Sequence, residues 1–136
     1  MKSGAGPTSV LDASALTAFV ENEPGADRVN AAMRHGALIS SINWAEVLAR
    51  LVRKSRDPIE AAAMALPGEA VGLQLVPFDD EHARESARLI WKTQGLGLSL
   101  ADRAALALGQ LRGIRVLTTD RAWRSLRLPI KIEVIR

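Results

Sequence analysis

Residues 8–21 read Thr-Ser-Val-Leu-Asp-Ala-Ser-Ala-Leu-Thr-Ala-Phe-Val-Glu, and this stretch indicates the fold. Its first four residues are a short β-prone run that stops at an aspartate. Residues 13–21 then place Leu16, Phe19 and Val20 on one side of a helix. The stretch therefore predicts a strand that passes directly into a helix.

The same alternation continues along the chain. Further strands are expected at 37–40, 71–78, 114–117 and 130–135. Further helices are expected at 27–35, 43–54, 59–66 and 120–125. Two longer helices are expected, one from 79 to the glycines at 95–97 and one from 99 to 113. Strands that alternate with helices predict a mainly parallel sheet with helices on both faces. We therefore predict the α/β class, with a central sheet of five strands and a single domain over 1–136.

Two of these helices have an apolar face that is expected to pack in the core. The side chains spaced for one face of the helix at 43–54 are Trp44, Val47, Leu48, Leu51 and Val52. In the helix that starts at 79, the expected core face consists of Ala83, Ala87, Ile90 and Trp91.

Composition excludes several function classes without selecting one. The chain has 136 residues, is 48% hydrophobic and has no cysteine, so disulfides, thiolate zinc sites and cysteine nucleophiles are excluded. Its formal net charge of +3 is compatible with a polyanionic partner but does not identify one. The first residues do not resemble a secretory signal, and no apolar run approaches the roughly eighteen residues of a membrane span. We therefore expect a soluble cytoplasmic protein with no membrane partner.

Four acidic residues fall where a site is expected. Asp12 closes the first strand and Asp120 follows the fourth, while Glu46 and Asp102 lie in the first turns of helices. Ligands of open parallel sheets bind outside the carboxyl ends of the strands, so all four acids meet if the first and fourth strands are neighbours. Such a cluster repels itself unless a divalent cation neutralises it, and Mg²⁺ or Mn²⁺ prefers oxygen ligands of this kind.

Each acid alone also has a local structural explanation, which stays open from the sequence. Asp12 and Asp120 precede helices, as N-cap residues do. Asp102 and Glu46 have the spacing of a capping box with Ser99 and Asn43, respectively. Glu46 also lies four residues before Arg50, which is the spacing of an ordinary ion pair on a helix surface.

The acids belong to four short segments that share a pattern. The segments are Val10-Leu11-Asp12-Ala13-Ser14-Ala15-Leu16, Ile42-Asn43-Trp44-Ala45-Glu46-Val47, Leu98-Ser99-Leu100-Ala101-Asp102 and Val116-Leu117-Thr118-Thr119-Asp120-Arg121-Ala122-Trp123. In order and spacing they resemble PIN-domain ribonucleases, in particular the single-domain VapC-type toxins of bacterial toxin–antitoxin pairs. The resemblance covers nearly the whole chain and implies a PIN-like three-layer sandwich.

The resemblance also implies an activity, a site and partners. The implied activity is a metal-dependent endoribonuclease in which Mg²⁺ or Mn²⁺ activates the attacking water. The implied ligands are Asp12, Glu46, Asp102 and Asp120, supported by the hydroxyls of Thr118 and Ser14 and by Asn43, which would orient Glu46. The implied partners are an RNA substrate, a second copy of the chain in a homodimer, and a cognate antitoxin whose C-terminal segment covers the active site.

Basic residues lie near these segments. Arg50, Arg53, Lys54 and Arg56 follow Glu46 and could guide an RNA backbone, although an ordinary charged outer face has the same pattern. Arg103 follows Asp102 where the family is expected to have a small residue, and it could contact RNA or point to solvent.

Two other classes of protein share part of this pattern. A phosphatase with an aspartyl nucleophile usually needs a second acid two residues later, where this chain has Ser14. A PIN-like module that binds RNA or protein without cleaving is the stronger alternative, but binding alone does not require a repulsive cluster of acids.

Overall fold

The computed structural model describes residues 6–54, 57–65, 68 and 71–136. Five strands form one sheet in the order β3-β2-β1-β4-β5, and every neighbouring pair is parallel. The strands are β1 (Ser9–Leu11), β2 (Ala37–Ser40), β3 (Leu73–Val76), β4 (Arg115–Thr118) and β5 (Ile132–Val134). The predicted parallel sheet of five strands is therefore confirmed.

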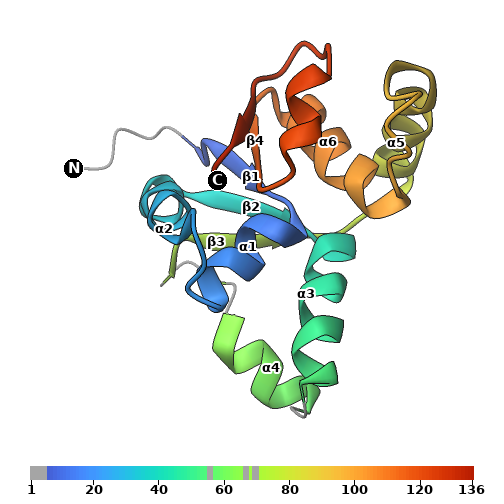
Figure 1. Ribbon diagram of the computed structural model, residues 1–136. Coiled ribbons are helices and arrows are strands. Elements are labelled where there is room, and N and C mark those ends of the chain that lie inside the picture. The colour runs from blue at the N-terminus through green and yellow to red at the C-terminus, as the bar shows by residue number, and fades with distance from the viewer. Residues whose placement is uncertain (1–5, 55–56, 66–67, 69–70) are drawn as a thin grey trace.

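Helices cover both faces of this sheet (Figure 1). One face carries α1 (Ala13–Val20), α2 (Ala26–His35), α3 (Ser41–Arg53) and α4 (Pro58–Ala65), and the other carries α5 (Asp80–Lys92), α6 (Leu100–Arg112) and the 3-10 helix η2 (Arg121–Ser125). This arrangement is the predicted three-layer α/β/α sandwich. No helix in the described part of the chain is long and apolar enough to cross a bilayer.

Consecutive strand residues alternate between two hydrophobic cores. Leu11 and Leu117 pack with α1 to α4, whereas Val10 and Val116 pack with α5, α6 and η2. Because both faces are buried, neighbouring positions such as Val10 and Leu11 are both apolar instead of alternating with polar residues. In the strand order, β1 and β4 lie side by side and each has a further strand on its other side.

The predicted core face of α5 is wrong. Ile90 and Trp91 are 40% and 74% exposed, and Ala83 and Ala87 are exposed as well. The buried side chains of α5 are His82, Ser86 and Leu89, and this helix packs against α6. Small polar side chains allow this close packing, and a hydroxyl can be buried when its own helix satisfies it. At the helix C-cap, for example, the buried Thr93 hydroxyl donates to the Leu89 carbonyl oxygen at 2.7 Å.

Helix α3 begins earlier than its periodicity predicts. Its N-cap is Ser40, whose hydroxyl accepts from the amide of Ile42 at 3.3 Å, so the helix starts at Ser41 instead of residue 43. Val47 and Leu51 are buried as predicted, but Val52 at the end of the apolar face is 37% exposed. The earlier start leaves Asn43 and Glu46 inside the helix.

Candidate active site

The four acids line a single pocket at the carboxyl edge of the sheet. Its volume is about 490 Å³, and its lining includes Asp12, Ser14, Asn43, Glu46, Asp102 and Asp120. The pocket forms there because β1 and β4 are neighbours, so that the residues that follow these strands emerge together. A larger cavity of about 640 Å³, lined by Thr8, Gln110 and Lys131, lies away from these acids, at the end of α6 where Arg112 is found.

Asp12 is the most buried of the four acids. As the N-cap of α1, its Oδ1 accepts from the amide of Ala15 at 2.8 Å and from the hydroxyl of Ser14 at 2.7 Å. Burial raises the pKa of this carboxyl to about 6, although hydrogen bonds from Thr118, Ser14 and Ala15 oppose the rise. The negative charge of Asp102 raises the pKa further. Capping therefore explains how Asp12 is held but not why an acid is buried there.

Two hydroxyl groups join the ends of β1 and β4 beneath this carboxylate. The Ser14 hydroxyl accepts from the amide of Thr119 at 2.9 Å and lies 3.4 Å from the Thr118 hydroxyl. The Thr118 hydroxyl accepts from the amide of Asp120 at 3.1 Å. The resulting network fixes Asp12 relative to the segment that carries Asp120, which itself caps η2 through the amide of Ala122.

Glu46 has neither of the local roles that its spacing allows. Because Ser40 caps α3, Glu46 is not part of a capping box. Arg50 does not pair with it either, since its guanidinium binds Glu21 at 2.8 Å. Desolvation and the negative charge of Asp102 raise the pKa of Glu46, and nearby Asn43 partly offsets the rise. Among the described residues, Glu46 is therefore a pocket carboxylate with neither the capping role nor the ion pair that its spacing allows.

Asn43 connects the two helices that carry Glu46 and Asp102. Its side chain is 1% exposed, and its Nδ2 donates to the carbonyl oxygen of Ala101 at 3.0 Å. Its Oδ1 is buried and has no hydrogen-bond partner among the described residues. A buried acceptor in a pocket of carboxylates is a natural partner for an ordered water.

Asp102 has a structural role as well as its place in the pocket. Its Oδ2 accepts from the amide of Ser99 at 3.0 Å, and the Ser99 hydroxyl accepts from the amide of Asp102 at 3.1 Å. The capping box predicted for these two residues is therefore confirmed. This reciprocal pair holds the Asp102 carboxylate in place at the start of α6.

The carboxylates of the pocket fit a divalent cation that keeps some of its water ligands better than one that is coordinated by protein alone. Their oxygens are the hard ligands that Mg²⁺ and Mn²⁺ prefer. Over the ranges that the structure describes, however, no three acidic, histidine or cysteine side chains converge closely enough to hold one ion. Mg²⁺ commonly keeps several waters and binds through one or two carboxylates. Asp102 influences the pKa of both Asp12 and Glu46, so it is the central member of the set.

The predicted RNA contacts take different positions. Arg50 lines the pocket but is held by Glu21, while Arg53 is exposed on α3. Arg103 turns toward the loop before α6, where its guanidinium donates to the carbonyl oxygen of Leu98 at 2.9 Å. Arg56 lies outside the described residues.

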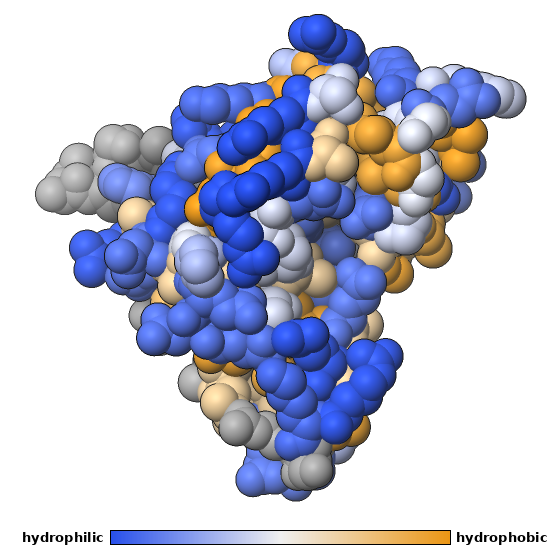
Figure 2. All heavy atoms as spheres, in the orientation of Figure 1, coloured by the Kyte–Doolittle hydropathy of each residue, from blue (hydrophilic) through white to orange (hydrophobic). Residues whose placement is uncertain are grey.

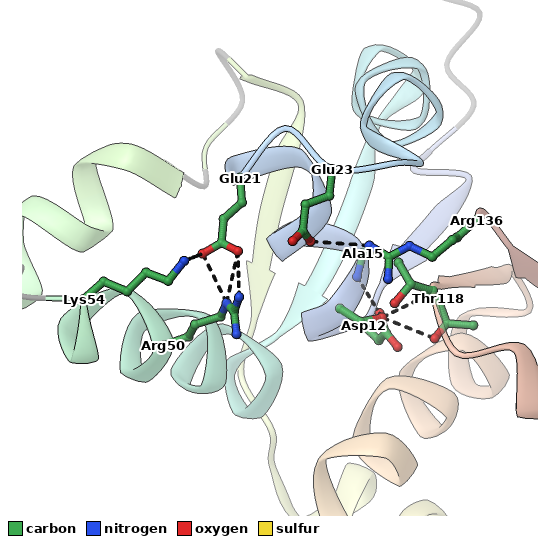
Figure 3. Close-up of polar contacts among 10 residues, drawn as sticks. Asp12, Ala15, Glu21, Glu23, Arg50, Lys54, Thr118 and Arg136 are labelled. Atoms are coloured by element: carbon green, nitrogen blue, oxygen red, sulfur yellow. Dashed lines mark hydrogen bonds and ion pairs between the residues drawn. The ribbon is translucent and has the colours of Figure 1, made fainter.

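Two charged residues of the pocket were not anticipated from the sequence. Glu23, in the turn between α1 and α2, and Arg136, after β5, both line the pocket, and their side chains approach to 3.4 Å (Figure 3). They are 113 positions apart, so no local spacing relates them. Only the pairing of β5 with β4 brings Arg136 to this edge of the sheet.

The sheet topology and the acid-lined pocket define an α/β domain of the PIN type. The family model of the PIN domain matches residues 9–128, and the chain belongs to this family. No curated protein matches the chain.

Solved structures that resemble this chain include toxin–antitoxin proteins. A DNA-bound VapBC of Salmonella typhimurium is 22% identical with a TM-score of 0.69, covering 93% of this chain and 96% of that one. A sarcin–ricin loop cleaving VapC toxin of Mycobacterium tuberculosis is 16% identical with a TM-score of 0.70, covering 88% and 97%. A toxin–antitoxin complex of Klebsiella pneumoniae is 19% identical with a TM-score of 0.68, covering 92% and 100%. At these identities the likeness establishes the fold.

Proposed function

We propose that this PIN domain is a metal-dependent endoribonuclease and the toxin of a toxin–antitoxin pair. The observation that carries the proposal is that Asp12, Glu46, Asp102 and Asp120 line one pocket. Within the described ranges, none of the four takes part in an ion pair. A protein keeps such a cluster at a cost in stability, and a bound divalent cation removes the repulsion.

The chain's own residues prepare the pocket for phosphodiester hydrolysis. Asp12 and Asp102 are the proposed direct ligands, because hydrogen bonds from Ser14 and Ser99 hold their carboxylates and because both are less exposed than Glu46 and Asp120. Glu46 and Asp120, which are exposed, would hold the ion through bound water. A bound Mg²⁺ or Mn²⁺ supplies Lewis-acid activation of a water and stabilises charge on the phosphodiester. Fixed ligands reduce the reorganisation needed when RNA binds.

Two protein partners are part of the proposal. The printed descriptions of the similar structures, which name toxin–antitoxin complexes, support a cognate antitoxin whose C-terminal segment covers the pocket. A homodimer is supported by the exposed apolar side chains of α5, where Ile90 and Trp91 reach solvent. Figure 2 shows hydrophobic side chains at the surface over α5, at the upper right of the view.

The first test is cleavage of total RNA by purified, antitoxin-free protein. We expect cutting with Mg²⁺ or Mn²⁺, none with EDTA, and none by Asp12→Asn. The matched control is Asp27→Asn, which removes an exposed acid from the first turn of α2 and should cut normally. Equal cutting by Asp12→Asn would refute the site.

The alternative is a PIN-like module that binds RNA or protein without cleaving it. Well-folded protein that cuts no RNA in the presence of either metal would make this the preferred function. The toxin role has a separate test, in which expression of the wild-type chain alone slows growth and co-expression of the small open reading frame beside its gene restores it. Growth unaffected by the wild-type chain would contradict that role.

A further inference from the structure

Glu23 and Arg136 face each other at the rim of the acid pocket. Figure 3 shows the two side chains reaching toward one another, Glu23 from the turn after α1 and Arg136 from the segment after β5. Their nearest atoms are 3.4 Å apart, and both side chains are a little more than one third exposed. Both also line the pocket that holds the four acids.

The backbone holds this arginine in place. The amide of Ile135 donates to the carbonyl oxygen of Thr118 at 2.9 Å, so the chain after β5 stays paired with the end of β4. Gly25 packs against Ile135 so closely that a Cβ atom there would lie 2.9 Å from the Ile135 side chain. The turn that carries Glu23 and the segment that carries Arg136 are thus pressed together.

The other arginine of the pocket is held more tightly. Glu21 accepts three hydrogen bonds from Arg50, at 2.8 to 3.2 Å, and a fourth from Lys54 at 2.7 Å. Arg136 has a single long contact with Glu23. Arg136 therefore loses little interaction energy if another anion replaces Glu23 as its partner. Arg50 would have to give up several hydrogen bonds to the Glu21 carboxylate.

A phosphate group that enters this pocket needs such a cation. Its negative charge meets four carboxylates, and a guanidinium binds phosphate oxygens with two parallel hydrogen bonds. Arg136 is the pocket cation whose present partner is easiest to displace.

We propose that Arg136 binds a backbone phosphate of the RNA over the acid pocket, and that Glu23 holds the arginine in place until RNA displaces it. The inference rests on the proposed ribonuclease function. It makes Arg136 a substrate-binding residue and Glu23 its positioning residue and competitor.

Binding without cleavage tests this pair. The probe is a fluorescein-labelled, random-sequence, single-stranded RNA oligonucleotide, titrated by fluorescence anisotropy with the full chain carrying Asp12→Asn. We expect Arg136→Gln to weaken binding about tenfold, the size of one lost hydrogen bond to a charged group. It should also reduce the slope of log affinity against log salt by about 0.7, as expected for one lost phosphate contact on single-stranded nucleic acid. Glu23→Gln should instead tighten binding.

The opposite effects of the two variants separate phosphate binding from a structural ion pair. If the pair only braces the fold, both substitutions break the same contact and shift binding in the same direction. The charge control is Arg112→Gln, at the other end of α6 from Asp102 and about 15 Å along the helix. Arg136→Gln that binds like Arg112→Gln would overturn the inference while leaving the nuclease intact. A parent protein that neither binds nor, with Asp12 restored, cuts RNA would overturn both.

Discussion

The Nδ2 of Asn43 donates to the carbonyl oxygen of Ala101 at 3.0 Å, and this bond joins the helix of Glu46 to the helix of Asp102. Two of the four pocket acids thus keep their spacing through one buried amide. The connection matters because α3 and α6 belong to different cores and meet near the pocket.

Asn43→Ala should reduce both stability and cleavage. Loss of this buried hydrogen bond is expected to lower the free energy of unfolding by about 1–2 kcal/mol. The spacing of Glu46 and Asp102 is then less well fixed, so kcat should fall more than substrate affinity. Urea denaturation and steady-state cleavage would measure the two effects. Asn30→Ala, in the middle of α2, is the control and should change neither by much.

Asp12 should make the metal-free protein less stable as pH rises. Its pKa is about 6 in the folded chain and 3.8 ordinarily, so the folded state binds more protons between these values. The free energy of unfolding contributed by this group is therefore highest below pH 3.8 and falls as pH rises through 6. Each pH unit in that window is worth about 1.4 kcal/mol, so the fall is at most about 3 kcal/mol.

Asp12→Asn removes this pH dependence and keeps the helix cap, because Asn is an equally good N-cap. In EDTA at neutral pH the variant should therefore unfold at a higher urea concentration than the wild type. If the urea midpoint of Asp12→Asn is equal to or lower than that of the wild type, burial of the Asp12 carboxylate costs the fold little stability.

Glu21 should have the opposite pH dependence. Hydrogen bonds from Arg50 and Lys54 lower its pKa to about 2, so its contribution to stability is present above pH 4.5 and is lost as pH falls through 2. Because the Arg50 and Lys54 side chains are 46% and 53% exposed, solvent screening limits this contribution to about 1 kcal/mol. Glu21→Gln should lower the free energy of unfolding by that amount at neutral pH, and high salt should reduce the difference between this variant and the wild type.

Divalent metal should stabilise the wild-type fold. At a hundred times its dissociation constant, an ion that binds only the folded state adds about 2.7 kcal/mol. The melting temperature of the wild type should rise with Mn²⁺, and that of Asp12→Asn should rise much less. Asp27→Asn should respond as the wild type does, and a similar response in all three would place the metal outside the acid pocket.

Trp91→Glu should dissociate the proposed homodimer. The substitution places a charge in the apolar face of α5, which has Ile90 beside it. Light scattering should then report a monomer that still cuts RNA if each chain holds a complete pocket. Ser125→Glu adds the same charge at an exposed position of η2 and should remain dimeric. A wild-type chain that is monomeric at all concentrations would contradict the dimer.

Local patterns predicted most of the architecture but not the packing of α5. The strands around Val10 and Val116 are buried on both faces, and such apolar runs are conspicuous in any sequence. The buried face of α5 was predicted wrongly because two of its apolar residues, Ile90 and Trp91, face outward while Ser86 and Thr93 are buried. Hydrophobicity alone does not reveal that a hydroxyl is satisfied by its own helix.

Three of the four pocket acids follow a strand or start a helix, and Glu46 was found because its helix was predicted to begin at residue 43 instead of Ser41. The surroundings of these acids could not be predicted from the sequence. The spacing allows Arg50 to pair with Glu46 four residues before it, but Arg50 binds Glu21 across the α1–α3 contact. The pairing of Glu23 with Arg136 likewise depends on β5 adding to the edge of the sheet.

Strands that are neighbours in the sheet are synthesised at different times. β1 leaves the ribosome before both of its neighbours, and the second of them, β4, follows more than a hundred residues later. A nascent chain that has exposed Asp12 and Glu46 still lacks Asp102 and Asp120. At about 5–20 residues per second, several seconds of translation pass before the last acid is made. A growing chain therefore lacks the complete acid set of the proposed site until Asp120, 108 residues after Asp12, has been made.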